Sequence, residues 1–362
     1  MTAFICSRCH KPYPEGGLPY RCPDCGGLFT LSGPLPFEPG TEEDLPGIWR
    51  YRETFLLPRS APVITLGEGD TPLIQEEILG KQVFFKLESF NPSGSFKDRG
   101  TAVLLSWAAA SGIPEVVEDS SGNAGASLGL YASRAGIQAK IYFPAEASGP
   151  KRAQIERSRA EMVPVPGPRS RAAEAVLQEA EQGAVYASHA YLPLGSPGIA
   201  TIAYEVWRQM PSPPGSVLVP VGHGSLLLGL FRGFRALREA GLIRRIPRLY
   251  GVQAAACDPL VQAVEQGLDH PADIKEGETL ADGVKIACPV HGEEILAAVS
   301  STQGKILRVE EAQIKMGRER LAAIGIDAEW TAALIWEGLI QTAEEAVEPI
   351  LGIISGHGWK TP

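Results

Sequence analysis

The sequence predicts an α/β protein with open, mostly parallel sheets covered by helices. Strand-like and helix-like segments alternate from Val63 to the C-terminus, which is typical of that class. With 362 residues and 44% hydrophobic content, the chain can bury a large core and divide into two or three domains. Paired cysteines precede the alternation, so a small N-terminal element is expected as well.

The expected strands are short runs rich in β-branched and aromatic residues. They cover residues 82–88, 115–119, 139–143, 216–221, 249–252 and 349–354. An amphipathic helix is expected over Phe96–Ala110, and a second one should run to Arg134. Ligands of such folds bind beyond the carboxyl ends of the strands, so the polar motifs that follow these strands are the candidate site.

Composition excludes several classes of partner. A net charge of -9 and a pI near 5.3 argue against nucleic acid or an anionic membrane. No apolar run approaches the ~20 residues of a membrane span, and the first residues lack a signal peptide's hydrophobic stretch. Two of the six cysteines, Cys257 and Cys288, stand alone, which suits a reducing compartment. We therefore expect a cytoplasmic enzyme.

Two Cys-x-x-Cys pairs, Cys6 with Cys9 and Cys22 with Cys25, are separated by twelve residues. Two loops that each offer two thiolates can close a tetrahedral site, so residues 1–32 resemble a zinc ribbon with structural zinc. Two disulfides are the alternative, which the compartment disfavours. Residues 33–48, rich in proline, glycine and acidic side chains, are expected to form a linker.

The most informative segment is Asn91-Pro-Ser-Gly-Ser-Phe-Lys-Asp-Arg-Gly100, which joins an expected strand to an expected helix. Lys97 would lie at the N-terminus of that helix. There the helix dipole and any burial disfavour the charged ammonium, which favours a nucleophilic amine suited to imine formation. A surface lysine at an ordinary loop-to-helix junction is the alternative.

This segment resembles the Asn-Pro-Thr-Gly-Ser-Phe-Lys-Asp-Arg-Gly motif of the threonine synthase family, with Ser93 in place of the usual Thr. The family uses pyridoxal 5'-phosphate (PLP), and the resemblance implies that Lys97 carries it as a Schiff base. It also implies fold type II, as in the tryptophan synthase beta subunit, with PLP in a cleft between two α/β domains. The larger domain would comprise 49–95 and 185–362, with a smaller inserted domain at 96–184. Family members are usually dimers.

The run Ser120–Ser127 follows a strand and opens a helix. It resembles the family's substrate-carboxylate loop, which implies that Asn123 bonds to the 3-hydroxyl of PLP. The substrate-binding candidates in this loop are Ser120, Ser121, Gly122 and Ala124. Ala124 stands where relatives that make threonine usually have Thr. A capped helix with a Gly-Asn turn is the alternative.

Two further motifs resemble the remainder of a PLP site. A glycine-rich turn opens a helix after residue 221 and resembles the family's phosphate cup, for which the candidates are Gly222, His223, Gly224, Ser225 and Leu226. His223 could donate to the phosphate or pack on the ring. Ser355, in a Ser-Gly-His-Gly ending, stands where the family places a hydroxyl at the pyridine nitrogen. Residues 279–285 and 330–333 also resemble family segments.

The resemblance weakens at residues 189–201, where the family commonly carries Arg, Glu and Lys for the substrate phosphate. Lys151, with Arg152 and Arg157 on the same expected helix, could supply the cation instead. A solvated helix face is the alternative.

The resemblance implies a threonine synthase-like lyase that converts O-phospho-L-homoserine and water to L-threonine and phosphate through the Lys97 Schiff base. Two alternatives remain open. One is a serine/threonine dehydratase or β-replacement enzyme that acts on another amino acid. The other is a non-catalytic PLP-binding relative.

Overall fold

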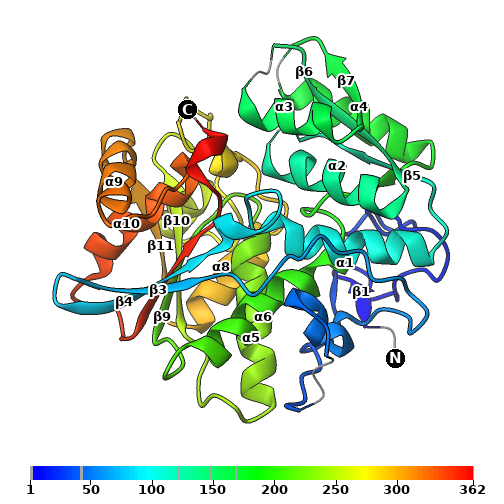
Figure 1. Ribbon diagram of the computed structural model, residues 1–362. Helices are drawn as coiled ribbons and strands as arrows, with labels where there is room; N and C mark the ends of the chain where they lie inside the picture. Colours follow the sequence, from blue (N-terminus) through cyan, green and yellow to red (C-terminus); the bar gives the residue numbers. More distant parts are fainter. Residues whose placement is uncertain (1–2, 41–43, 121, 147–148, 168, 362) are drawn as a thin grey trace. The chain divides into compact units, whose positions relative to one another are not determined.

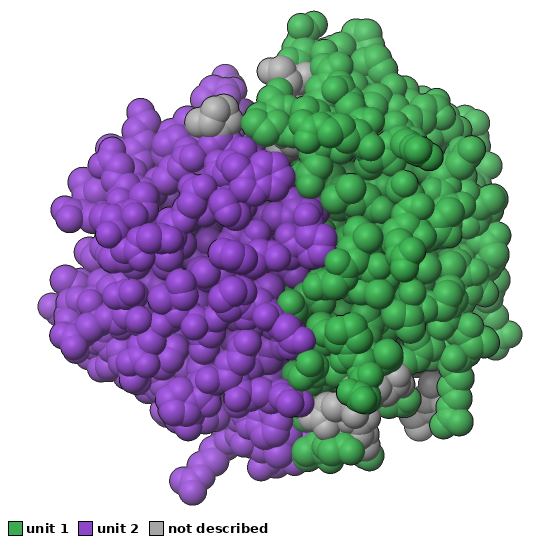
Figure 2. All heavy atoms as spheres, viewed as in Figure 1, with its two compact units in different colours: residues 1–69, 97–199 green, residues 70–96, 200–362 purple. Residues whose placement is uncertain are grey.

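The computed structural model describes residues 3–40, 44–120, 122–146, 149–167 and 169–361 (Figure 1). The chain divides into two compact units, which Figure 2 colours separately. Unit 1 comprises Met1–Gly69 and Lys97–Ile199, and unit 2 comprises Asp70–Phe96 and Ala200–Pro362. The chain therefore passes from unit 2 into unit 1 between Phe96 and Lys97.

The N-terminal ribbon, residues 3–32, is a small element of unit 1 with its own core. Strands β1 (Phe4–Cys6) and β2 (Phe29–Leu31) pair antiparallel. The Tyr13 ring lies 4.5 Å from the ring of Phe29, which is 1% exposed and packs with the cysteines. So few apolar side chains make a weak core, and a bound metal is the usual supplement in elements of this size.

Within the described residues 33–40 of the expected linker, apolar side chains are buried. Leu35 and Phe37 are buried, and the Phe37 ring lies 6.3 Å from that of Tyr51 in the 3-10 helix η1 (Gly47–Phe55). Apolar side chains at these positions hold the expected linker against the rest of unit 1.

A buried carboxylate explains why residues up to Gly69 group with unit 1 and not, as the expected division had it, with the larger domain. Glu68 accepts hydrogen bonds from Trp49 Nε1 at 2.8 Å and from the Leu66 amide at 3.0 Å. The hydroxyl of Tyr131, on helix α2 (Asn123–Ala135), donates to the same carboxylate at 2.7 Å. A fully bonded buried carboxylate fastens these segments to one another.

The sheet of unit 1 is fully parallel, with strand order β7-β6-β5-β8. Its strands are β5 (Glu115–Glu118), β6 (Gln138–Pro144), β7 (Glu161–Val165) and β8 (Val185–Tyr186). Its helices are α1 (Lys97–Ala110), α2, α3 (Pro150–Arg157), α4 (Arg169–Glu181) and the 3-10 turn η3 (Pro193–Gly195). Helix α1 was expected to be amphipathic, but it is buried along most of its length because it packs against both α2 and η3.

The sheet of unit 2 has the order β11-β10-β9-β12-β4-β3 and is parallel except for the edge pair β3-β4. Its strands are β3 (Leu73–Ile78), β4 (Lys81–Leu87), β9 (Ser216–Pro220), β10 (Arg248–Ala254), β11 (Lys305–Val309) and β12 (Ile350–Ile354). Its helices are α6 (Ser225–Glu239), α7 (Pro259–Glu265), α8 (Gly292–Ser301), α9 (Glu311–Ala323) and α10 (Trp330–Thr342), and α5 (Ser196–Gln209) enters it from unit 1. Short 3-10 turns are η2 (Glu88–Phe90), η4 (Asp282–Val284) and η5 (Gly358–Lys360). Two open, mostly parallel sheets covered by helices confirm the predicted fold class.

An ion pair lies within the core of unit 2. Lys86, on β4, is fully buried, and its Nζ donates to Glu205 Oε2 at 2.6 Å. The same ammonium donates to the Thr71 carbonyl at 2.7 Å and to Gln209 Oε1 at 2.8 Å, while the Asp70 amide donates to Glu205 at 2.9 Å. Because every proton of the ammonium is bonded, the pair can stay charged out of water and fasten β4 to α5.

Across the described ranges, every helix is too short or too polar to traverse a lipid bilayer.

Candidate active site

Lys97 is the first residue of α1, as the sequence predicted, and is half-buried. The residues before it pair with the end of the chain inside unit 2. The Phe96 amide donates to the Ser355 carbonyl at 3.1 Å, and the His357 amide donates to the Gly94 carbonyl at 3.0 Å. The segment before Lys97 and the Ser355 motif, more than 250 positions apart in the sequence, are therefore hydrogen-bonded to each other. Lys97 is the next residue after this junction.

The Ser355 side chain is 2% exposed, and among the described residues its Oγ has no hydrogen-bond partner. Ser95, on the opposite side of the same junction, is fully buried with an unbonded hydroxyl as well. A buried hydroxyl without a protein partner forfeits its hydrogen bond with water, so such a group in a native protein calls for a ligand, an ion or an ordered water. This fits the hydroxyl that a PLP ring nitrogen requires.

The glycine-rich turn after β9 has the backbone shape of an anion site. Gly224 is the N-cap of α6 with φ 89°, a left-handed conformation that favours glycine, and it has no side chain with which to cap the helix. The first amides of a helix have no intrahelical acceptor, and the helix dipole adds about half a positive charge at that end. The five predicted residues 222–226 therefore surround a helix N-terminus that suits a phosphate.

Two of the segments that resemble the family meet this turn. A Cβ on Gly222 would lie 2.8 Å from the Gly283 carbonyl oxygen, so the two loops touch through bare backbone. The Gly283 amide donates to Thr331 Oγ1 at 3.0 Å. Residues 279–285, residues 330–333 and the glycine-rich turn thus form one cluster in unit 2.

The other candidates lie in unit 1. Asn123 is the first residue of α2 and Gly122 its N-cap, so the run 120–127 opens a helix, as the sequence predicted. A Cβ on Gly125 would lie 1.8 Å from the Ser120 carbonyl oxygen, so only glycine permits this loop shape. Ser121 and the Lys151 side chain lie outside the described residues, so their predicted roles stay untested.

A buried carboxylic acid lies near Lys97. Glu118, the last residue of β5, is 3% exposed, and among the described residues its Oε2 has no partner. Burial and the charge of Asp119 raise the pKa of Glu118 well above that of an ordinary glutamate, and the positive charge of Lys97 opposes the shift only in part. At a given pH, more of the Glu118 carboxyl is therefore protonated than that of an ordinary glutamate.

The imidazole of His189 contacts Thr101 near the start of α1. His189 Nε2 is 2.9 Å from Thr101 Oγ1, which donates to the Lys97 carbonyl at 2.9 Å and accepts from Ser127 Oγ at 2.7 Å. With the single Thr101 proton used, Nε2 carries the ring proton and donates it. Burial and the charge of Lys97 lower the pKa of His189 well below its usual range, so the ring is neutral. A Cβ on Gly100 would lie 2.8 Å from this ring, which makes glycine necessary there.

The run 189–201, where the family has charged residues, is apolar and buried. Leu192 is 3% exposed and Leu194 1% exposed. A Cβ on Gly198 would lie 2.1 Å from the Arg99 carbonyl oxygen, so this run packs backbone to backbone against α1. On α3, Arg152, one of the cations expected to replace the family's charged residues, forms an ion pair with Glu156 at 3.1 Å.

The four ribbon cysteines converge on one point. Their sulfurs lie within 4.8 Å of one another, with Cys6 and Cys25 at 3.5 Å and Cys9 and Cys22 at 3.6 Å. A disulfide needs about 2.05 Å, whereas thiolates on tetrahedral zinc lie roughly 3.8 Å apart. Although the Lys11 amide opposes the shift, burial and hydrogen bonds to neighbouring thiols raise the pKa of Cys9 to about 12. Four thiolates this close need a cation, so the donor set fits structural zinc.

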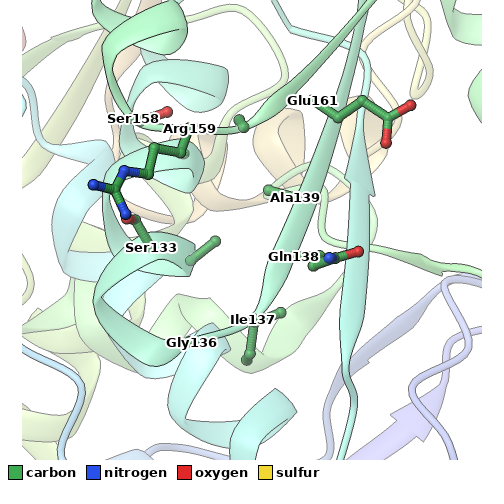
Figure 3. Close-up of a pocket in the computed structure, with 11 residues that line it drawn as sticks. Ser133, Gly136, Ile137, Gln138, Ala139, Ser158, Arg159 and Glu161 are labelled. Atoms are coloured by element: carbon green, nitrogen blue, oxygen red, sulfur yellow. The ribbon is translucent and has the colours of Figure 1, made fainter.

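A separate pocket of about 310 Å³ lies wholly within unit 1 (Figure 3). Its walls come from the second half of α2, the start of β6 and the turn before β7, including Gln138 and Glu161. These residues mark the amino ends of their strands, whereas Glu118 and the loop after it lie at the carboxyl end of the parallel sheet. The pocket is therefore not the candidate active site.

The sequence analysis did not single out Glu118, Thr101 or His189 as site residues. Glu118 could have been noticed, because a glutamate directly after the apolar residues Val116 and Val117 of an expected parallel strand is unusual. His189 offered no local signal, since its role depends on a contact with a helix 88 positions earlier.

Comparison with known proteins gives concordant results. Residues 64–356 match the family described as pyridoxal-phosphate dependent enzyme. The chain is 31% identical to a threonine synthase of Methanocaldococcus jannaschii, over 99% of this chain and 92% of that protein. A threonine synthase of Methanosarcina acetivorans is 29% identical, over 100% of this chain and 93% of that protein. Among solved structures, a threonine deaminase of T.th. has a TM-score of 0.68 at 26% identity, over 79% of this chain and 92% of that chain.

Proposed function

Because the chain belongs to the threonine synthase family of PLP-dependent enzymes, we propose that it converts O-phospho-L-homoserine and water to L-threonine and phosphate. The observation that carries this proposal is the match to curated threonine synthases over the whole length, ribbon included. The unbonded Ser355 hydroxyl and the α6 N-terminus support the cofactor part independently.

PLP, when bound, withdraws electrons from the α-carbon of an amino acid attached to it. Lys97 would hold the cofactor and move protons at the substrate carbons, and Asn123 would bond to the 3-hydroxyl. Ser355 would bond to the ring nitrogen. A neutral hydroxyl does not enforce a protonated ring, which suits elimination and replacement better than transamination.

The remaining roles follow the same proposal. Residues 222–226 would hold the cofactor phosphate through the α6 amides. Ser120, Gly122 and Ala124 would border the substrate carboxylate, together with Ser121 and Lys151. Glu118, whose raised pKa favours the protonated acid and whose Oε2 has no partner among the described residues, would be a further proton donor near Lys97.

A second function is favoured by one observation, the buried leucines at 192 and 194 in the run where the family has charged residues. Without those cations, a substrate that lacks a phosphate would be accepted more readily. The chain would then be a serine/threonine dehydratase or a β-replacement enzyme. A PLP-binding relative without turnover remains a third outcome of the test below.

The test combines a spectrum with a substrate panel. PLP-loaded protein should absorb near the visible edge, and borohydride should remove the band and fix the cofactor to the chain. Lys97→Ala should lack the band, while Lys305→Ala, at an exposed lysine, should keep it. Phosphate release from O-phospho-L-homoserine supports the first function, and keto-acid formation from serine or threonine supports the second. A wild type that stays colourless after loading with PLP contradicts both.

The proposal also covers the bound metal, the oligomeric state and the cellular compartment. We place zinc at the four cysteines, assign a homodimer as is usual in the family, and place the enzyme in the cytoplasm. Six unpaired thiols support a reducing compartment. The net charge of -9 supports a small amino-acid substrate in preference to nucleic acid or an anionic membrane.

A further inference from the structure

A tyrosine of the ribbon packs against two tyrosines of unit 1: Tyr186, which ends strand β8, and Tyr191, which follows that strand. The Tyr20 ring lies 5.7 Å from that of Tyr186 and 5.6 Å from that of Tyr191, edge-on to both. Those two rings are 5.4 Å apart, so the three form one cluster. Edge-to-face pairs at such distances attract beyond simple burial.

The first of these contacts leads to the substrate loop. Tyr186 pairs with Val117 across β8 and β5, and its hydroxyl donates to Asp119 Oδ1 at 2.6 Å. Asp119 immediately precedes Ser120, where the candidate substrate loop begins. Movement of the Tyr186 ring would therefore release the residue from which this loop departs.

The second contact leads to the helix that carries Lys97. Tyr191 closes a turn in which its amide donates to the Ser188 carbonyl at 3.2 Å. The same turn carries His189, which bonds to Thr101 on the first turn of α1. The ribbon strand β2 also contacts η3, which follows this turn.

Metal binding would fix Tyr20 because it lies two positions before Cys22. The intervening Arg21 donates to the Gly26 carbonyl at 2.9 Å, within the second cysteine loop. Its guanidinium lies 5.3 Å from the Tyr191 ring. Tyr20 is thus joined both to the second cysteine loop, through Arg21, and to the tyrosine cluster, through its own ring.

We propose that Tyr20 is a positioning residue through which the metal-bound ribbon holds the substrate loop and the His189 turn in place. This rests on the proposed function only in assigning the loop after Asp119 to the substrate carboxylate. The ribbon, in this interpretation, is part of the catalytic apparatus and not only a stable N-terminal cap.

The test uses the PLP-loaded, full-length protein with four substitutions. Tyr20→Ala removes the ring, and Tyr20→Phe keeps it and should behave as wild type. Lys11→Ala removes only an exposed ribbon ion pair and is the matched control, since such pairs contribute little. Tyr186→Phe keeps the tyrosine cluster and deletes only the bond to Asp119. Zinc content of each protein shows whether its ribbon is intact.

Two quantities are measured for each protein. The first is amide hydrogen exchange in peptides covering residues 117–124 and 185–192. The second is KM and kcat for O-phospho-L-homoserine. Tyr20→Ala should accelerate exchange in both peptides and raise KM roughly tenfold, with a smaller change in kcat, since two aromatic pairs are lost. Tyr186→Phe should accelerate exchange in 117–124 alone.

The proposal is overturned if zinc-replete Tyr20→Ala matches Lys11→Ala in exchange and KM. If Tyr20→Ala loses its zinc or fails to fold, Tyr186→Phe becomes the deciding variant. Exchange in residues 117–124 and a KM that both equal those of the wild type in Tyr186→Phe would also overturn the proposal. If the wild type does not turn over O-phospho-L-homoserine, the proposed function fails, and the exchange pattern still decides the role of Tyr20.

Discussion

Replacing Glu118 by Gln tests whether this buried acid is protonated in the folded protein. In the unfolded chain a glutamate ionises near pH 4.3, whereas burial and Asp119 raise the pKa of Glu118 well above that value in the fold. The folded state then holds a proton that the unfolded state releases. The resulting stabilisation is complete below the unfolded pKa and is lost as pH rises toward the folded pKa. Because Gln cannot ionise, the stability of Glu118→Gln should not fall with pH for this reason.

The magnitude follows from the linkage of one proton. Relative to Glu118→Gln, the wild type should lose about 1.4 kcal/mol of unfolding free energy per pH unit above the unfolded pKa, until its own carboxyl ionises. That corresponds to about 2 °C per pH unit if the chain unfolds as a whole, or roughly twice that if unit 1 unfolds alone.

The assay is thermal unfolding of both proteins at pH 5, 6, 7 and 8. Glu115→Gln is the matched control, because Glu115 begins the same strand but is partly exposed and paired with Lys140 at 2.9 Å. The melting temperature of Glu118→Gln should rise relative to wild type as pH increases, and that of the control should show no such trend. A difference that is flat or falls between pH 5 and 8 would refute the assignment of a raised pKa to Glu118.

Three further predictions concern the metal, the buried ion pair and the substrate loop. Cys22→Ser should bind less than one zinc per chain and expose the ribbon to protease, whereas full zinc content would argue against a four-thiolate site. Lys86→Met should lower the unfolding free energy by about 3–5 kcal/mol because the buried Glu205 carboxylate loses its ammonium partner, and Glu205→Leu in the same chain should recover much of that loss by calorimetry. Gly125→Ala should raise KM or prevent folding, since its Cβ would lie 1.8 Å from the Ser120 carbonyl oxygen, and unchanged kinetics and melting would contradict that close approach.

The correct predictions concerned motifs whose geometry is local. Lys97 lies at the start of α1, and the runs after β5 and β9 open α2 and α6, as the sequence predicted. A strand that ends in glycine and polar residues before an apolar helix has few alternative conformations, so the pattern suffices. The four cysteines converge for a similar reason, because two short Cys-x-x-Cys loops need only one hairpin to meet.

The missed features depend on contacts between distant segments. Proline and glycine dominate the pattern of residues 33–48, which predicts a linker. The burial of Leu35 and Phe37 depends on tertiary contacts that this pattern does not reveal. The extent of unit 1 depends on Glu68, whose partners Trp49 and Tyr131 lie 19 and 63 positions away. Periodicity carries no information on such pairings.

The sequence alone determined the fold class, the family and the position of Lys97 at the start of a helix, because these depend on hydrophobic period and on short motifs with fixed backbone requirements. Tertiary structure decided the directions in which the pKa values of Glu118 and His189 shift, since both depend on burial and on charges from other elements, and it decided the packing of Tyr20. The pKa of a group depends on the burial and charges around it, and a contact such as that of Tyr20 depends on how the chain folds in space. Neither can be deduced from the residues adjacent in sequence.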